Sequence, residues 1–180
     1  VPFSPGGGVD ILARLIGAKL SESLKQSFII DNRGGAGGTI GVGIAARATP
    51  DGYTTVLTSN SLAFNATLYK NLPYDTIKDL APISLVATSP NILVTHPSLP
   101  VNSVQELIQF AKAQPGKLNY GSGGLGGASQ ICAEYFLRMA GINVGHVPYK
   151  GAAPALIDLM AGSIAFTMSP SMTWIASAER

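Results

Sequence analysis

The stretch LNYGSGGLGGASQICAEYF, residues 118–136, decides how the chain is interpreted. It predicts a short strand over 118–120, a glycine-rich loop over 121–127 and then an amphipathic helix. Glycine lets the backbone adopt a positive φ and approach a ligand closely. The helix that follows presents unpaired N–H groups and the positive end of its dipole to the loop. Such a unit is suited to bind a carboxylate or a phosphate.

Three further units share this plan. SPGGG (4–8) precedes a helix predicted over 9–25, and RGGAGG (33–38) precedes a small-residue helix over 39–48. YKGA (149–152) precedes another helix. The remaining predicted strands are 1–3, 28–30, 54–58, 144–148 and 164–168. Strands that alternate with helices through short loops predict an α/β fold with mostly parallel sheets.

The middle of the chain predicts a crossover between two lobes. Residues 65–80 are expected to be irregular, and 81–95 form a long extended apolar stretch broken at 89–91. Its length suits a strand pair that leaves one domain and enters another. Residues 1–88 are therefore assigned to the N-terminal part of the first lobe, and residues 89–180 to the second lobe.

A cleft lined by neutral donors follows from this arrangement. Right-handed crossovers place strand-to-helix loops at one edge of a sheet, where ligands of such folds bind. The donors are backbone N–H groups and side-chain hydroxyls or amides. They belong to Gly6 to Gly8, Gly35 to Gly38, Gly121 to Gly127, Gly151, Ser59, Asn60, Ser61 and Ser122. Such a site binds a small anion reversibly, although the glycines can equally serve only to shape tight turns.

Composition excludes several classes of function. The net charge is +2 and no Lys or Arg is followed by another, so nucleic-acid binding has no electrostatic basis. No apolar run approaches the eighteen residues of a membrane span. Cys132 is the single cysteine, which precludes an internal disulfide, and its helical position predicts a buried core thiol.

An enzyme or nucleotide-binding domain is the alternative, with the 121–127 loop holding a phosphate. Gly121, Gly123 and Gly126 match the dinucleotide pattern, but INVGHVP downstream lacks the acidic residue that holds a ribose. His96 and His146 are fifty positions apart without metal-ligand spacing. No catalytic residue, metal site or cofactor is predicted, and His146 is interpreted as structural or as part of the cleft wall.

Seven segments of the chain resemble the Bug-type receptors of the tripartite tricarboxylate transporter family, in the family's order. They are VPFSPGGGVDILAR, NRGGAGGTIG, PDGYT, LYKNLPYD, ILVTHPSLP, LNYGSGGLGG and HVPYKGAAPAL. The resemblance implies a periplasmic, two-lobed, type II (Venus-flytrap) α/β receptor without catalysis. It would close on a small carboxylate and present it to a membrane permease. Family ligands include di- and tricarboxylates, acidic amino acids and aromatic carboxylates, and the full-length protein would be a monomer. A receptor-like sensor partner is a third possibility.

The resemblance also implies which residues touch the ligand. Main-chain groups of the first loop would hold a carboxyl group, and two loops of the facing lobe would complete the site. Carried over, they are Phe3, Ser4, Gly6, Gly7, Gly8, Gly121, Ser122, Gly123, Gly124, Tyr149, Lys150 and Gly151. Ser4 replaces a proline that is usual in the family, and Ser169 replaces an aspartate, which leaves the identity of the ligand open.

The two ends of the chain suggest part of a longer protein. Residues 1–3 look like the end of a strand, and Arg180 falls inside a helix predicted from Ser171. Family members continue beyond this point to complete the first lobe. We therefore expect exposed apolar surface on residues 1–88, with a tendency to aggregate or exchange strands.

Overall fold

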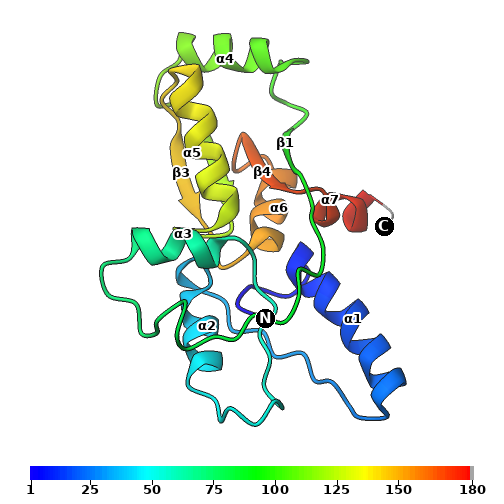
Figure 1. Cartoon of the computed structure of the whole chain (residues 1–180). Coiled ribbons are helices and arrows are strands. Elements are labelled where there is room, and N and C mark those ends of the chain that lie inside the picture. Colours follow the sequence, from blue (N-terminus) through cyan, green and yellow to red (C-terminus); the bar gives the residue numbers. More distant parts are fainter. Residues whose placement is uncertain (179–180) are drawn as a thin grey trace.

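A four-stranded mixed sheet organises the C-terminal half of the chain. The computed structural model describes residues 1–178 (Figure 1). The strands are β1 (Asn91–Thr95), β2 (Asn119–Ser122), β3 (Gly145–Pro148) and β4 (Phe166–Pro170). Their order is β1-β4-β2-β3, with β2 parallel to both β3 and β4 and β1 antiparallel to β4. The three parallel strands therefore end at one edge of the sheet, as the glycine loops predict.

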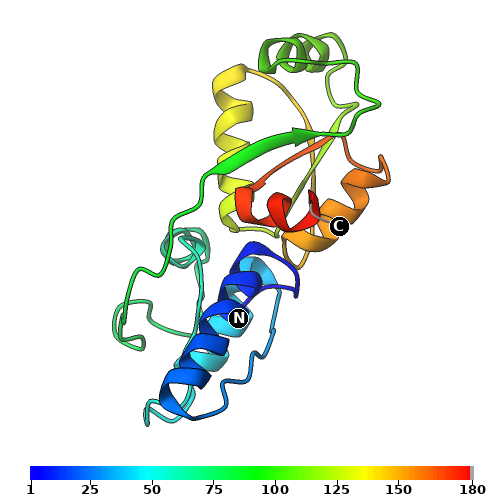
Figure 2. The ribbon, with the colours of Figure 1, turned by 90° about the vertical axis from the view of Figure 1, so that its right-hand side faces the viewer.

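Helices cover both faces of this sheet. The connection through α5 (Ala128–Ala140) leads outward from β2 to β3, and that through α6 (Ala152–Met160) leads back from β3 to β4. Because right-handed crossovers in opposite directions lie on opposite faces, the sheet separates α5 from α6 (Figure 2). The core between these layers includes the fully buried Leu107, Tyr120 and Phe166.

Helix α4 (Val104–Ala113) begins with the side-chain cap of Ser103. The Ser103 hydroxyl accepts a hydrogen bond from the Glu106 N–H at 3.1 Å. The Glu106 carboxylate in turn accepts one from the Asn102 N–H at 2.6 Å. These two hydrogen bonds fix the chain at the start of α4 by satisfying the N–H groups of Glu106 and Asn102. Helix α7 (Ser171–Ala178) begins where it was predicted.

The N-terminal half contains helices without a sheet. These are α1 (Gly8–Leu24), the short 3₁₀ helix η1 (Ala36–Gly38), α2 (Thr39–Ala46) and α3 (Ser61–Leu68). The predictions of strands at 1–3, 28–30 and 54–58 are wrong, and α3 replaces the start of the segment predicted to be irregular. Residues 69–80 contain only turns and coil, as predicted. Val1 forms one isolated parallel β-bridge: its amino group donates to Asp31 O at 2.8 Å, and its carbonyl oxygen accepts from Arg33 N at 2.9 Å. A single bridge without neighbouring pairs does not form a sheet.

Apolar side chains remain exposed across this half, as expected. Ile29, Tyr53 and Ile83 are 89%, 91% and 83% exposed. Cys132 is only half buried, so the prediction of a core thiol is wrong. Among the helices of residues 1–178, none has the length and apolar character needed to cross a membrane.

Candidate ligand-binding site

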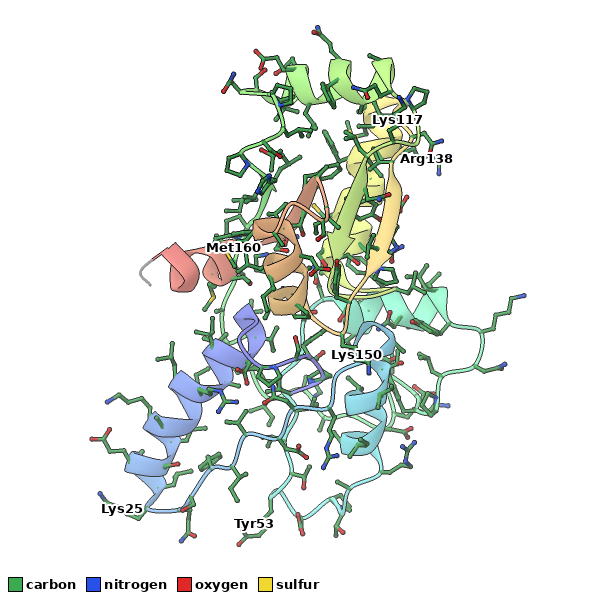
Figure 3. All side chains as sticks on the ribbon, turned by 180° about the vertical axis from the view of Figure 1, so that it is seen from behind. Lys25, Tyr53, Lys117, Arg138, Lys150 and Met160 are labelled. Carbon is green, nitrogen blue, oxygen red and sulfur yellow. The ribbon has the colours of Figure 1, made fainter. Side chains whose placement is uncertain are left out.

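The glycine loops of the two halves meet in direct backbone contact. Ser4 N donates to Lys150 O at 3.0 Å, and Figure 3 labels Lys150 at this junction. A Cβ at Gly34 would lie 2.7 Å from the same carbonyl oxygen, and a Cβ at Gly37 would overlap Leu125 O. Glycine is required at both positions because the facing backbone leaves no room for a side chain. These glycines therefore allow the two backbones to pack directly against each other.

A buried carboxylate holds the first loop. Asp10 is 2% exposed, and its Oδ2 accepts from Gly6 N at 2.9 Å and from Arg14 Nε at 3.0 Å. Its Oδ1 accepts from Asn32 Nδ2 at 2.9 Å. Burial raises the pKa of Asp10, but the hydrogen bonds from Arg14, Gly6 and Asn32 outweigh it and leave the pKa below its usual value. The sequence analysis did not identify Asp10 as a residue that holds this loop. The Gly6–Asp10–Arg14 spacing was the signal that it missed.

The loop 121–127 satisfies most of its own donors. Gly123 N donates to Ser129 Oγ at 2.9 Å, and Gly126 N to Gln130 Oε1 at 2.7 Å. Gly124 N donates to Ser122 Oγ at 3.2 Å. Gly121 lies inside β2, where Ile164 occupies the space of a side chain and Tyr149 and Ala155 crowd it. The loop is thus a fixed surface rather than a set of free donors.

His146 contacts this loop through the hydroxyl of Ser122. Its Nε2 lies 2.6 Å from Ser122 Oγ, and its ring stacks on Tyr120 with centroids 4.7 Å apart. Burial lowers the pKa of His146, and the charge of Glu134 opposes this effect in part. The imidazole is thus part of the wall of the site, in the structural role that the sequence predicted.

The 149–151 loop faces Ser4. The Tyr149 hydroxyl donates to Asp158 Oδ2 at 2.5 Å, and burial together with this carboxylate raises the pKa of Tyr149 to about 12. Gly151 has a φ of 155°, and a Cβ there would overlap the Ser4 hydroxyl. The ring of Phe3 lies on the facing half, 3.2 Å from the Cβ position of Gly38.

The segment 59–61 does not join the other loops through any hydrogen bond among residues 1–178. The Ser59 and Ser61 hydroxyls bond to each other at 2.8 Å, and Asn60 is exposed. Asn65, one turn further along α3, lies in the junction instead and donates from Nδ2 to Gly37 O at 3.0 Å. It is 1% exposed, and its Oδ1 has no partner within the described chain. Sequence reasoning missed Asn65 because α3 was not predicted.

Three helix N-termini converge at the junction (Figure 1). A Cβ at Gly7 would lie 3.9 Å from Ala152 N at the start of α6. Gly8 N donates to Thr173 Oγ1 in the first turn of α7 at 3.2 Å. Within residues 1–178, the N–H groups of Gly7, Gly151 and Ala152 have no recorded acceptor. Together with the positive ends of the helix dipoles, these donors make the start of α6 the most suitable point for an anion.

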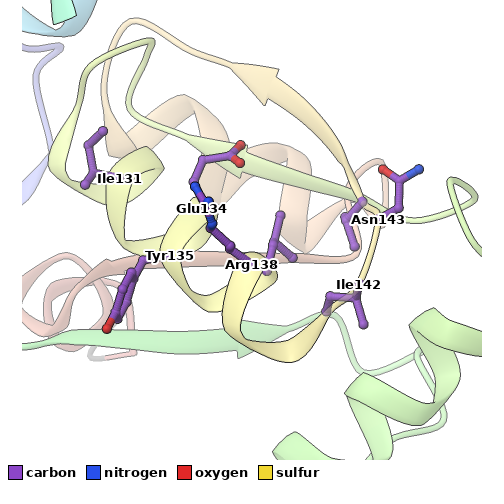
Figure 4. A pocket seen from close by; sticks show the side chains of 8 residues that line it. Ile131, Glu134, Tyr135, Arg138, Ile142 and Asn143 are labelled. Atoms are coloured by element: carbon purple, nitrogen blue, oxygen red, sulfur yellow. The ribbon is translucent and has the colours of Figure 1, made fainter.

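Two open surface hollows lie elsewhere. One of about 570 Å³ is formed by α5 and the segment before β3, and Glu134, Tyr135 and Arg138 line it (Figure 4). The other, of about 580 Å³, is formed by residues of the 66–77 region. The described residues hold no group of three His, Cys, Asp or Glu side chains that could bind a metal ion.

An α/β half packed against facing glycine loops, with helix N-termini at the junction, is also the arrangement of binding proteins that enclose a small solute between two lobes. Comparison with known proteins agrees with this class. The chain belongs to the receptors of the tripartite tricarboxylate transporter family, because the model of that family matches residues 12–179. These receptors are solute-binding proteins and not enzymes, which removes the enzyme alternative.

Individual relatives are similar over nearly all of this chain. Protein BugT of Bordetella pertussis is 40% identical over 167 residues, covering 92% of this chain and 51% of BugT. The R. palustris protein Rpa4515, solved with adipate, is 42% identical with a TM-score of 0.91, covering 94% of this chain and 57% of that one. The periplasmic binding protein BugD is 33% identical with a TM-score of 0.92, covering 95% and 57%. This chain thus spans about half the length of the relatives that it matches.

Proposed function

We propose that the protein is part of a periplasmic receptor that binds a small organic carboxylate and delivers it to the membrane permease of a tripartite tricarboxylate-type transporter. The observation that carries this proposal is the set of free N–H groups of Gly7, Gly151 and Ala152 where α1 meets α6. Support comes from the relative Rpa4515, which was solved with a dicarboxylate.

Closure of the two halves is the proposed mechanism. A carboxylate has two oxygens and accepts hydrogen bonds from Gly7 on one half and from the start of α6 on the other. Because these bonds form together only when the halves are close, the ligand favours the closed state by its differential affinity. Neutral main-chain donors bind the charge without the desolvation of a buried cation.

Replacement of one N–H group tests the proposal. Ala152 is the first residue of α6, a position where proline fits the helix and removes only the N–H group. Ala152→Pro should therefore weaken adipate binding about tenfold, the value of one charge-assisted hydrogen bond. Val104→Pro, at the first position of α4, is the matched control and should bind adipate as the unmodified protein does.

Calorimetry with adipate, inorganic phosphate and AMP provides the readout. Binding of phosphate or AMP with adipate inert would refute the carboxylate proposal in favour of phosphate recognition. Equal affinity of the two proline variants for adipate would show that the start of α6 is not the binding point.

A further inference from the structure

We propose that His146 is a positioning residue for the 121–127 loop and that protonation of its imidazole strengthens the binding of the anionic ligand. This inference rests on the proposed function, because it assigns a pH response to the same site.

The contact that carries it is a two-step hydrogen-bonded connection. His146 Nε2 lies 2.6 Å from Ser122 Oγ, and this hydroxyl accepts from Gly124 N at 3.2 Å. Ser122 is completely buried, so water does not replace either partner. The imidazole therefore acts on the hydroxyl that fixes the turn of the loop, and Gly124 packs against Gly37 of the other half.

Both protonation states of His146 fit this geometry. A hydroxyl offers one donor and two acceptor positions. Next to a neutral imidazole that carries its proton on Nδ1, Ser122 donates to Nε2 and accepts from Gly124 N. Next to an imidazolium, it accepts from both groups and donates toward Gly124 O, which lies 3.4 Å away. Protonation thus adds a positive charge behind the loop without breaking the turn, and that charge attracts an anion held at the junction.

The groups around His146 determine the pH at which its imidazole becomes protonated. Tyr120 and Ser122 reach it from β2, and Glu134 reaches it from α5. The Tyr120 hydroxyl donates to Glu134 Oε1 at 2.5 Å, which orients the ring on which His146 stacks. Burial holds the pKa of His146 below its ordinary value, so the imidazole is neutral at pH 7 and takes up a proton only at a lower pH than a free histidine does. By reciprocity, a bound anion must raise the pKa of His146.

Titration of adipate binding against pH tests the inference. The proteins are the unmodified chain, His146→Gln and the control His96→Gln. His96 bonds to Ser98 next to β1, the strand at the other edge of the sheet from β3. Protonation of adipate affects all three proteins alike, so the ratio of affinities isolates the histidine. The unmodified protein should gain at least about fivefold over His146→Gln between pH 8 and pH 5, and His96→Gln should follow the unmodified protein.

Histidine NMR gives a second readout that needs no variant to fold. Adipate should move the titration midpoint of His146 upward. A constant affinity ratio together with an unmoved His146 midpoint would overturn the inference while leaving carboxylate binding intact. Failure of the unmodified protein to bind adipate at every pH would overturn the proposed function and this inference with it.

Discussion

Replacing Gly37 by alanine tests whether this glycine is needed for close contact between the two halves or only for its left-handed backbone conformation. Gly37 has a φ of 61°, and its missing Cβ is where Leu125 O of the other half lies. Gly141 has a φ of 62° with nothing within 4 Å of the Cβ position. Both alanine variants carry the left-handed penalty of roughly 1–2 kcal/mol. Only Gly37→Ala also forces the two halves apart.

The size of the additional effect follows from the hydrogen bond at this contact. Tyr69 Oη on the first half donates to Leu125 O on the second half at 3.0 Å. Separation by a Cβ weakens this bond, which is worth roughly 0.5–1.5 kcal/mol. The closed state should therefore lose about 0.5–1.5 kcal/mol, which corresponds to roughly a 2- to 13-fold loss of adipate affinity.

Three measurements decide the outcome. Urea unfolding should show similar losses of stability for Gly37→Ala and Gly141→Ala. Calorimetry with adipate should show weakened binding for Gly37→Ala alone, and small-angle scattering should show its larger radius of gyration. Gly34→Ala adds a variant without a positive φ, whose Cβ would lie 2.7 Å from Lys150 O. Equal affinities and radii for Gly37→Ala and Gly141→Ala would refute the closing role.

Other predictions concern stability. Leu107→Ala should lower the free energy of unfolding by about 2–5 kcal/mol in urea titrations, because Leu107 is 1% exposed. Asp10→Asn should lower the free energy of unfolding by about 1–2 kcal/mol at pH 7. Because the pKa of Asp10 is lowered in the folded state, this loss of stability should be complete above about pH 4 and should disappear as the pH falls through the folded-state pKa. Tyr149→Phe should cost about 1 kcal/mol by losing the bond to Asp158, whereas Tyr53→Phe at a 91% exposed position should leave the melting temperature unchanged.

Local signals predicted the C-terminal half well. The Ser103 cap, the glycine loop after β2 and the start of α7 at Ser171 are each encoded within a few neighbouring residues. Strands in this half also find partners along the same sheet. The segments 28–30 and 54–58 carry the same apolar pattern but pair with no neighbouring strand among the described residues, so pattern alone did not suffice.

The sequence predicted which loops form the candidate site, but it did not predict which of their N–H groups are free to bind a ligand. Sequence reasoning treated Gly6 N, Gly8 N and Gly123 N as donors that await a ligand. In the structure they bond to Asp10, Thr173 and Ser129, partners 4, 165 and 6 positions away. A partner 165 positions distant leaves no trace in sequence spacing, whereas the Asp10 spacing could have been read.

These internal hydrogen bonds change the role assigned to the glycine loops. A loop whose N–H groups are already satisfied is rigid before the ligand arrives, so binding does not have to supply the entropy of ordering it. The donors left for a ligand, Gly7 on one half and Gly151 and Ala152 on the other, are those that only closure brings together. Affinity at such a site depends on how closely the two backbones approach. Glycine at positions 34 and 37 is therefore as important for binding as the donors themselves, although neither position needs to touch the ligand.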